Sequence, residues 1–372
     1  MRLLVTGGAG FIGSHTVDIL LRRGHTVRVV DALVPQVHGP QRRRPAYLDP
    51  DVELIVGELQ DPEVVSRALD GIDSVIHLAS LVGVGQSMYE ITRYCQANVM
   101  GTAVLLQTIV ERKMELKSFV VASSISSYGE GRYARSDGRL VDPPVRPEEQ
   151  LAAGDWEVRD LDGHVLTPVP TDEEKSLRPI SLYAINKRDQ EEMCLCIGGA
   201  YGIPATALRF FNVYGARQAL SNPYTGVAAI FCARLLNDKQ PLIFEDGRQR
   251  RDFVHVEDIA SAVVLAAENP APGEAINIGS GEVTTITNLA TTLANAMGKD
   301  IEPEILGKYR KGDIRHCFAD ISKARRLLGY EPARPFRENV PELISWVQTQ
   351  QGAAEDGVDS AWHELSSRGL LA

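Results

Sequence analysis

The chain has 372 residues, of which 44% are hydrophobic and 24% are charged, as in ordinary soluble enzymes, so it can bury a large core and form more than one domain. Its net charge of −10 excludes the basic surface of a nucleic-acid-binding protein, and no apolar run is long enough to span a bilayer. Because Met1 and Arg2 lead directly into an apolar segment, we expect no signal peptide and a cytoplasmic protein whose five cysteines are reduced.

Short apolar runs alternate with amphipathic stretches in the first half of the chain. The runs predict buried strands at residues 3–5, 26–30, 53–56, 74–78 and 118–122, and two later runs predict further strands of the same sheet at 206–210 and 275–278. The stretches between them predict helices, among them 14–23, 62–69 and 97–113. Strand–helix–strand alternation with continuously apolar strands indicates an α/β fold with a parallel, doubly wound sheet.

The remaining segments are less regular. Helices are predicted at residues 283–297, 322–328 and 341–348, and the tail from residue 351 is expected to pack weakly, with one short helix near 361–368. Residues 130–178 are rich in Pro and Gly and show little periodicity, which is typical of functional loops. We expect an inserted flap there, with a small hairpin at Asp162-Gly163.

Three glycines follow the first predicted strand. Gly7, Gly10 and Gly13 are spaced for a tight turn from a strand into a helix. A side chain at Gly7 or Gly10 would hold a pyrophosphate away from the backbone, whereas the helix N-terminus offers amide donors and a partial positive charge. The pattern therefore predicts a dinucleotide site in a Rossmann-type fold.

Asp31 ends the second predicted strand, 18 residues after Gly13. A carboxylate at this place accepts hydrogen bonds from ribose hydroxyls and repels a 2′-phosphate, so it favours NAD over NADP. The alternative interpretation is that Asp31 is only a turn residue.

Tyr183 and Lys187 indicate chemistry at a carbon that bears a hydroxyl. They are four residues apart and share one face of a helix. A Lys charge about 5 Å from a phenol, at an effective dielectric constant near 20, is worth about 3 kcal/mol, or about two pKa units. The positive nicotinium ring of a bound cofactor would add to this effect, so Tyr183 is expected to act as a base near neutral pH. Such a pair also occurs often by chance on helix surfaces.

A run of serines favours the catalytic interpretation of this pair. The segment 123–129 follows an apolar strand, and hydroxyls at the carboxyl end of a sheet strand point into the crevice where ligands bind. Ser124 can share a hydrogen bond with a substrate hydroxyl and Tyr183, whereas Ser123 and Ser127 are compatible with capping a turn.

Together these motifs resemble the extended short-chain dehydrogenase/reductases of the nucleotide-sugar epimerase/dehydratase group. The resemblance covers nearly the whole chain and also includes HLA at 77–79, NVMGT at 98–102, RFFNVYG at 209–215, RDFVHVED at 251–258 and the segment 312–320. It implies an NAD-binding Rossmann domain at residues 1–212 and 259–279, and a smaller C-terminal α/β domain at 213–258 and 280–372 that binds the nucleotide sugar.

Carried over by position, the resemblance makes Tyr183 the base, Lys187 its activator and a ribose ligand, and Ser124 the partner of the substrate hydroxyl. The implied NAD contacts, besides Tyr183 and Lys187, are Gly7, Gly10, Phe11, Ile12, Gly13, Asp31, Glu58, Leu59, Leu78, Ala79 and Asn98. The implied contacts to the nucleotide sugar are Ser124, Ser126, Asn212, Arg217, Arg251 and Arg315. Arginines suit the diphosphate because their geometry is bidentate. Glu58 stands where relatives carry Asp, and no metal is expected.

The Ser-rich turn discriminates within this group. Dehydratases place an Asp-Glu pair before the Val-Tyr of this turn and decarboxylases keep a Glu, whereas this chain has Ile125 and Ser126. A site without these carboxyls favours 4-epimerisation. In that reaction a sugar hydroxyl is oxidised to a ketone, the intermediate rotates, and hydride returns to its opposite face, so NAD is regenerated in each turnover.

A narrower resemblance concerns the substrate. The segment 217–231, the insertion and the tail at 364–370 resemble dTDP-L-rhamnose 4-epimerases, which interconvert dTDP-L-rhamnose and dTDP-6-deoxy-L-talose. Other activities stay open: a UDP-glucose/galactose or UDP-glucuronate 4-epimerase, a nucleotide-sugar ketoreductase or decarboxylase, or a non-catalytic NAD-binding regulator. We also expect the insertion to cover the sugar and exclude water, and a homodimer formed by a four-helix bundle of helices near 90–113 and 182–201.

Overall fold

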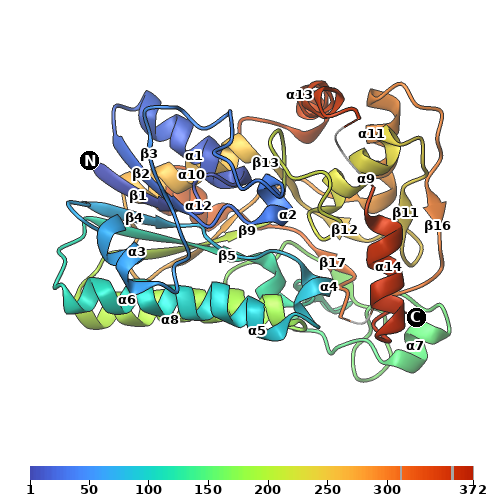
Figure 1. The fold of residues 1–372 in the computed structure, drawn as a ribbon. Coiled ribbons are helices and arrows are strands. Elements are labelled where there is room, and N and C mark those ends of the chain that lie inside the picture. Colours follow the sequence, from blue (N-terminus) through green and yellow to red (C-terminus); the bar gives the residue numbers. More distant parts are fainter. Residues whose placement is uncertain (311, 353–355, 372) are drawn as a thin grey trace.

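A seven-stranded parallel sheet forms the centre of the protein, whose computed structural model describes residues 1–310, 312–352 and 356–371 (Figure 1). The strand order is β14-β9-β5-β4-β1-β2-β3. The strands are β1 (Arg2–Thr6), β2 (Thr26–Asp31), β3 (Glu53–Val56), β4 (Ser74–His77), β5 (Ser118–Ser124), β9 (Ala205–Phe210) and β14 (Ala275–Ile278). Each coincides with a predicted apolar run, so the predicted doubly wound α/β fold is confirmed.

The connections of this sheet define where a ligand can bind. From β1 the chain runs to β2 and β3 on one side, and it then returns to β4, β5, β9 and β14 on the other. The registers Thr6↔Val30 and Thr6↔His77 align the carboxyl ends of β1, β2 and β4. Doubly wound sheets bind ligands beyond these ends, at the point where the strand order reverses. That point lies between β1 and β4.

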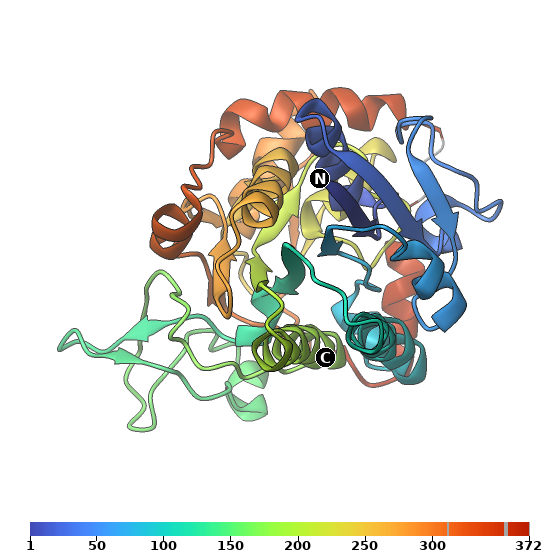
Figure 2. The same ribbon diagram turned by 90° about the vertical axis from the view of Figure 1, so that its left-hand side faces the viewer.

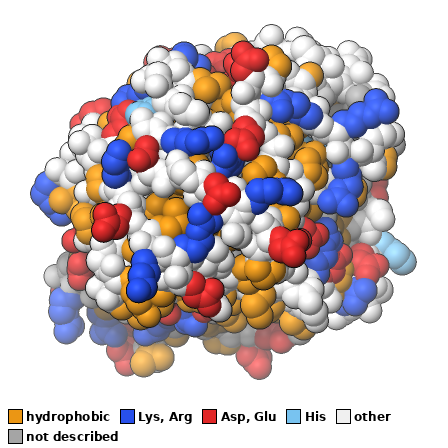
Figure 3. Space-filling view, turned by 60° about the vertical axis from the view of Figure 1, so that its left-hand side comes forward, with side chains coloured by type: hydrophobic (Ala, Val, Ile, Leu, Met, Phe, Trp, Pro, Cys, Tyr) orange, Lys and Arg blue, Asp and Glu red, His pale blue; other side chains and the backbone are white. Residues whose placement is uncertain are grey.

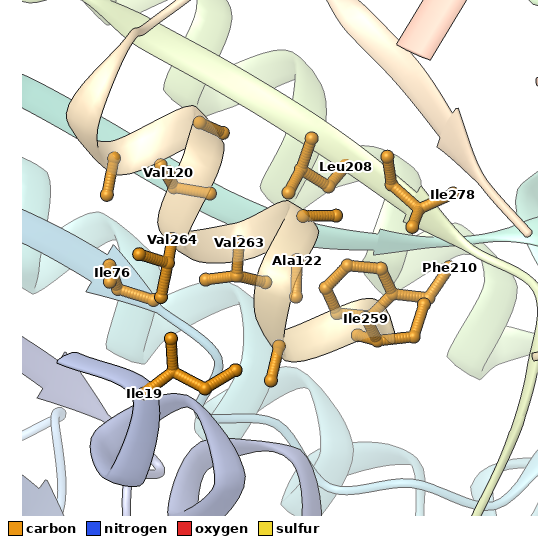
Figure 4. Close-up of a cluster of buried hydrophobic side chains, with 14 of the residues drawn as sticks. Ile19, Ile76, Val120, Ala122, Leu208, Phe210, Ile259, Val263, Val264 and Ile278 are labelled. Atoms are coloured by element: carbon orange, nitrogen blue, oxygen red, sulfur yellow. The ribbon is translucent and has the colours of Figure 1, made fainter. Parts of the chain in front are cut away.

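Helices cover both faces of the sheet (Figures 1 and 2). One face carries α1 (Phe11–Arg22), α10 (Val256–Glu268) and α12 (Ser322–Leu328), and the other carries α3 (Pro62–Ala68), α6 (Gly101–Glu111) and α8 (Leu182–Tyr201). Figure 4 shows the first of these interfaces, with Ile19 of α1 and Val263 and Val264 of α10 against apolar side chains of the strands. Because helices bury the sheet on both faces, its strands are continuously apolar.

Two predicted helices begin earlier than expected. The helix predicted at 97–113 is preceded by α5 (Ile91–Tyr94) and a π-helical turn, η1 (Cys95–Met100), before α6. The helix predicted at 341–348 is α13 (Phe336–Thr349), with Pro341 inside it. Proline removes one helical hydrogen bond, but Phe336 and Val340 are buried by this first turn, so their packing outweighs that loss.

The C-terminal part packs three helices around its own core. These are α9 (Val227–Leu236), α11 (Ile286–Ala296) and α13, with Phe231, Phe253 and Phe336 among the buried side chains. Small sheets flank them: β10 (Asn212–Tyr214) with β13 (Phe253–His255), β11 (Leu242–Ile243) with β16 (Glu304–Ile305), and β15 (Thr284–Thr285) with β12 (Arg250–Arg251) and β17 (His316–Cys317). The proposed domain boundaries stay a prediction.

The insertion is an ordered unit that projects beside α8 (Figure 2). It contains β6 (Tyr133–Ala134), β7 (Leu140–Val141), α7 (Glu148–Ala152) and β8 (Thr167–Pro168). Tyr133, Val158 and Leu166 form its small core. The predicted hairpin is confirmed, since the Asp160 amide donates to the His164 carbonyl at 2.9 Å and Gly163 has φ of +86°.

The surface is mixed in charge. On the face shown in Figure 3, basic and acidic side chains are interspersed with small hydrophobic patches. Among the described helices, none combines the length and the sustained apolar character that crossing a membrane requires.

Candidate active site

A cavity of about 830 Å³ opens beyond the carboxyl ends of the sheet strands and extends to α9 and to α14 (Val358–Ser367). The predicted site residues on its wall are Gly7, Gly10, Phe11, Ile12, Gly13, Asp31, Glu58, Leu59, Leu78, Ala79, Ser124, Ser126, Tyr183, Lys187, Asn212 and Arg251. Asn98, Arg217 and Arg315 are described but are not among the lining residues. The structure therefore brings most of the predicted dinucleotide and catalytic residues together.

The glycine-rich turn between β1 and α1 is shaped by its own backbone. Gly7 has φ of +69°, and a Cβ there would lie 2.8 Å from the Ala79 amide nitrogen. A Cβ on Gly13 would lie 2.2 Å from the Gly7 carbonyl oxygen. At Gly10, which faces the cavity, the nearest such contact is 3.3 Å, so the missing side chain leaves the backbone open to a ligand. This turn and the N-terminus of α1 fit a pyrophosphate.

Asp31 is held in place by backbone donors. Its Oδ2 accepts the Ala9 N–H at 3.0 Å and its Oδ1 accepts the Leu33 N–H at 2.8 Å. Each carboxylate oxygen retains acceptor capacity, and the side chain lines the cavity. Asp31 thus stabilises the turn and is also placed for the ribose hydroxyls, so the two interpretations are compatible.

Asn98 supports the cavity wall from behind. It lies fully buried in η1, and its amide group accepts from the Leu81 N–H at 2.7 Å and donates to the Leu81 carbonyl at 3.2 Å. Leu81 belongs to the loop that lines the cavity after β4. π-helical turns are rare and occur often at functional sites. In this structure Asn98 positions the loop.

Ser124 and Tyr183 meet at the carboxyl end of β5. Ser181 caps α8 by accepting the Ala184 N–H, and this places Tyr183 in the first turn of the helix. Ser124 lies close enough to the Tyr183 hydroxyl to favour its ionised form, and the Ser124 Oγ accepts from the Ser126 hydroxyl at 2.9 Å. The predicted pair of hydroxyls is therefore present on one side of the cavity.

Burial dominates the ionisation of the catalytic pair. It raises the pKa of Tyr183 to about 12, and the hydrogen bond from Ser124 opposes this rise. Burial also lowers the pKa of Lys187 to about 7. The physical reason is that loss of solvent disfavours the charged form of both groups. The expected lowering of the pKa of Tyr183 by Lys187 and the nicotinium ring of NAD therefore has to act against this burial, and the role of Tyr183 as a base stays a prediction.

A buried polar chain connects Lys187 to the glycine-rich turn. Lys187 Nζ donates to Gln190 Oε1 at 2.7 Å, and Gln190 Nε2 donates to Thr102 Oγ1 at 2.9 Å. The His77 ring is hydrogen-bonded to the Thr102 hydroxyl at 2.8 Å through Nε2 and to the Thr6 hydroxyl at 2.7 Å through Nδ1. Burial, helped by the Lys187 charge, lowers the pKa of His77 to about 3, so this ring is neutral. Gln190 was not predicted, because no local motif marks it.

Three amide side chains face the cavity with an unsatisfied atom. The side-chain oxygens of Asn212, Gln218 and Gln249 are buried and have no hydrogen-bond partner among the described residues. Buried polar atoms are nearly always paired in proteins, so these amides fit a ligand that carries polar groups. Asn212 was predicted; Gln218 and Gln249 were not.

The predicted arginines are in different environments. Arg251 lines the cavity and donates to the carbonyl oxygens of Arg315 at 2.8 Å and Ile314 at 2.7 Å. Arg217 pairs with Asp18 at 2.8 Å and lies over the ring of Tyr47. Arg251 is therefore placed to meet an anion, whereas contacts of Arg217 with a ligand stay a prediction.

Arg315 is fully buried among carboxylates. It pairs with both oxygens of Asp246 at 2.6 and 2.9 Å, with Glu245 at 2.9 Å and with Glu157 at 2.8 Å. Its charge is thus neutralised inside the protein. Glu157 comes from the insertion, so this network fastens the insertion to the C-terminal part.

The insertion does not cover the cavity, contrary to our expectation. Residues 127–179 are all described, and none of them lines it. Their apolar side chains fill the insertion's own core, and their acids bond Arg315. The wall on the C-terminal side instead comes from the loop 218–226, from Phe244 and Arg310, and from α14.

Known proteins are similar to this chain in sequence and in fold. Residues 3–160 and 162–279 match the model of the NAD dependent epimerase/dehydratase family. The chain is 36% identical over 350 residues to a dTDP-L-rhamnose 4-epimerase of Burkholderia thailandensis, which covers 93% of this chain and 94% of that relative. The crystal structure of UDP-glucose 4-epimerase from Thermotoga maritima with UDP-glucose is 32% identical, with a TM-score of 0.76 over 94% of this chain and 99% of that one. That of UDP-glucuronic acid 4-epimerase from Bacillus cereus, with UDP-glucuronic acid and NAD, is 28% identical, with a TM-score of 0.77 and the same coverage of 94% and 99%.

Proposed function

Because the chain belongs to the NAD dependent epimerase/dehydratase family, we propose that it is a nucleotide-sugar 4-epimerase whose substrates are dTDP-L-rhamnose and dTDP-6-deoxy-L-talose. The observation that carries the reaction type is the set of Ser124, Tyr183 and Lys187 on a cavity wall without a carboxyl group beside it. The similarity to a dTDP-L-rhamnose 4-epimerase over 93% of the chain supports the choice of sugar.

NAD is the cofactor, and the glycine-rich turn and Asp31 fit it. Gly10 leaves room for the pyrophosphate, and Asp31 offers acceptors for the ribose of the adenosine half. Glu58 and Leu59 line the neighbouring part of the wall. When bound, NAD takes a hydride from the sugar carbon and later returns it.

Ser124 and Tyr183 handle the proton of the substrate hydroxyl. Both side chains line the cavity and lie close together, so a substrate hydroxyl that enters between them can donate to Tyr183 and be oriented by Ser124. Tyr183 needs a positive charge nearby to ionise, since burial raises its pKa to about 12. Lys187, one helical turn away, supplies this charge in its protonated form, which its pKa of about 7 keeps populated near neutral pH, and Gln190 accepts a hydrogen bond from it at 2.7 Å.

The acids on the wall argue against elimination. Of the lining residues that the structure describes, Asp31, Glu58 and Asp313 are the only carboxylates. Asp31 ends β2 and Glu58 follows β3 at the dinucleotide end, and Asp313 pairs with Arg310 at 2.9 Å. Beside Ser124 stand Ile125 and Ser126, which cannot deliver a proton as a carboxyl group does. This favours return of the hydride over loss of water.

The cations on the wall favour a sugar without a carboxylate. Arg93 pairs with Glu90, Arg310 with Asp313, and Arg234 with two aspartates. Arg251, which donates to backbone carbonyls, is the wall arginine that we assign to the diphosphate. A uronic acid would require a further unpaired cation close to the catalytic hydroxyls. A UDP-glucuronate 4-epimerase is therefore the less supported alternative.

The activity is tested by NMR of C4 stereochemistry with purified enzyme and three substrates: dTDP-L-rhamnose, UDP-galactose and UDP-glucuronate. We expect only dTDP-L-rhamnose to be converted catalytically to its 4-epimer. Epimerisation of a UDP sugar instead would show that this sugar is the substrate. If none of the three is converted, the proposal of a nucleotide-sugar 4-epimerase is rejected. Stoichiometric consumption of added reduced cofactor would identify a ketoreductase.

The homodimer is part of this proposal. The helices expected in the bundle, α5, α6 and α8, lie side by side on one face of the sheet (Figures 1 and 2). Ile91 and Met100, at the start of this helical layer, have more than half of their side chains exposed, 55% and 54%. Such apolar exposure is consistent with a partner surface. Sedimentation equilibrium would measure the state directly, and a monomer at micromolar concentration would refute the dimer.

A further inference from the structure

Helix α14 in the C-terminal tail touches both sides of the cavity. Toward the N-terminal part, Leu365 packs against Gly85 of α4 (Val84–Ser87), where an added Cβ would lie 3.2 Å from it. Toward the C-terminal part, the Trp362 ring lies 5.0 Å from that of Phe244. In Figure 1, α14 stands between α4 and the strands β11 and β16. The tail, expected to pack weakly, is in fact a bridge across the cavity.

Polar contacts, two of them with Arg234 and Arg310 of the cavity wall, hold α14 in this position. Asp359, in its first turn, pairs with Arg234 at 3.1 Å and with Lys239 at 2.9 Å. Beyond the helix, the backbone of Leu371 forms an antiparallel bridge with Arg310. The helix is therefore fixed at both ends to the C-terminal side of the cavity wall.

One face of α14 is apolar and points at the cavity. Val358, Ala361, Trp362 and Leu365 have helical spacing, and all four line the cavity. An apolar helix face is normally buried against other side chains. Here part of that face is presented to a space where a ligand can lie.

The end of the cavity near Trp362 suits a flat, aromatic group. Phe244 carries the Arg310 guanidinium over its ring at 4.7 Å and has Trp362 beside it. Planar bases stack on aromatic rings and on arginine. A nucleotide sugar with its C4 hydroxyl at Ser124 and Tyr183 must extend its diphosphate and base away from these residues, along the wall that includes Arg251.

We propose that Trp362, carried on α14, is a substrate-binding residue that stacks on the nucleobase of the nucleotide sugar and gives this enzyme part of its specificity. This inference rests on the proposed function, because it takes a nucleotide sugar as the ligand. The base then lies between the C-terminal part and a helix that also contacts α4, so binding of the substrate completes the closure of the cavity.

Nucleotide binding without turnover tests the proposal. The chain has three tryptophans, so a Trp156→Phe/Trp346→Phe variant leaves Trp362 as the only one. We expect saturable quenching of its emission by dTDP, and a weaker effect of UDP if Trp362 contributes to specificity. If saturating dTDP and UDP both leave the emission unchanged, the inference is overturned.

Variants at Trp362 give the second measurement. In calorimetric titrations Trp362→Ala should weaken dTDP binding by about tenfold, as expected for loss of one base–aromatic stack, while Trp362→Phe should restore most of it. His363→Ala, at an exposed position of the same helix, is the matched control and should bind dTDP as the parent does. NAD binding should be unchanged in all three.

The outcomes separate the two proposals. Parent-like dTDP affinity in a folded Trp362→Ala protein would reject the role of Trp362 even if the enzyme epimerises dTDP-L-rhamnose. Conversely, Trp362-dependent dTDP binding in a protein that converts no sugar would reject the proposed reaction and keep the binding role.

Discussion

Lys187 Nζ donates a hydrogen bond to Gln190 Oε1 at 2.7 Å; both side chains are buried in α8, and Lys187 lies one turn from Tyr183. The lysine is therefore oriented by its own helix before any ligand is considered. Through Thr102 and His77 the same polar chain reaches β1, so the catalytic helix and the glycine-rich turn share one hydrogen-bonded support. Such networks hold a site rigid when every member is satisfied.

Replacing the proposed base should abolish most of the activity. Tyr183→Phe keeps the buried ring but removes the proton acceptor, so kcat for epimerisation should fall by about 10²–10⁴-fold. Tyr201→Phe, at the exposed end of the same helix, is the control and should retain parental kcat. The measurement is C4 epimerisation by NMR, together with circular dichroism. Unchanged turnover in a folded Tyr183→Phe protein would favour a non-catalytic NAD-binding role.

The buried Lys187 should make stability depend on pH in a defined direction. Its pKa is about 7 in the folded protein against a usual value of 10.5, so the folded state prefers the neutral amine. The free energy of unfolding should therefore rise with pH between 7 and 10.5, by at most about 1.4 kcal/mol per pH unit. Lys187→Met removes this dependence.

Melting temperatures at pH 7 and pH 9 measure the effect. Relative to Lys187→Met, the parent should gain stability at the higher pH, whereas Lys308→Met, at an exposed lysine, should follow the parent. An equal difference between parent and Lys187→Met at both pH values would show that the lysine is charged in the folded state throughout this range.

Sequence patterns predicted what is encoded locally. Continuous apolar runs gave all seven central strands, because strands buried on both faces need no polar alternation. The glycine spacing, Asp31 and the Ser124, Tyr183 and Lys187 set are short-range motifs, and all of them line one cavity.

What could not be predicted depends on contacts between distant residues. Arg315 has its acidic partners Glu245 and Glu157 at separations of 70 and 158 residues, so a position-by-position resemblance could not show that its charge is already paired. The effect of burial on the pKa of Tyr183 could not be predicted for a related reason, since a spacing of four residues gives no information on burial. Trp362 was not predicted as a site residue because its aromatic partner, Phe244, lies far from it in the sequence.

Arg315 and Arg251 should respond differently to substitution. Arg315→Met removes the cation shared by Glu245, Asp246 and Glu157, of which Glu245 is buried, and should reduce the free energy of unfolding by about 3–5 kcal/mol. Arg251→Met, on the cavity wall, should instead raise KM for the nucleotide sugar with a smaller effect on stability. Chemical denaturation and steady-state kinetics on both variants check this. A raised KM with parental stability in Arg315→Met would show that Arg315 binds the diphosphate after all.

Two glycine-to-alanine substitutions, one in the dinucleotide turn and one in a helix, should have opposite effects on the protein. In Gly13→Ala the new Cβ would lie 2.2 Å from the Gly7 carbonyl oxygen, so the backbone of the turn must move and NAD should no longer co-purify with the protein. Gly199→Ala, inside α8, meets nothing within 4 Å and has no positive φ, so it should stabilise the protein by about 0.5–1 kcal/mol and keep NAD. NAD released by denaturation is quantified by its absorbance, and stability by urea unfolding. Parental NAD content in Gly13→Ala would mean that the turn tolerates a side chain at its tightest contact, and the assignment of this turn as the pyrophosphate site would then lose its main physical support.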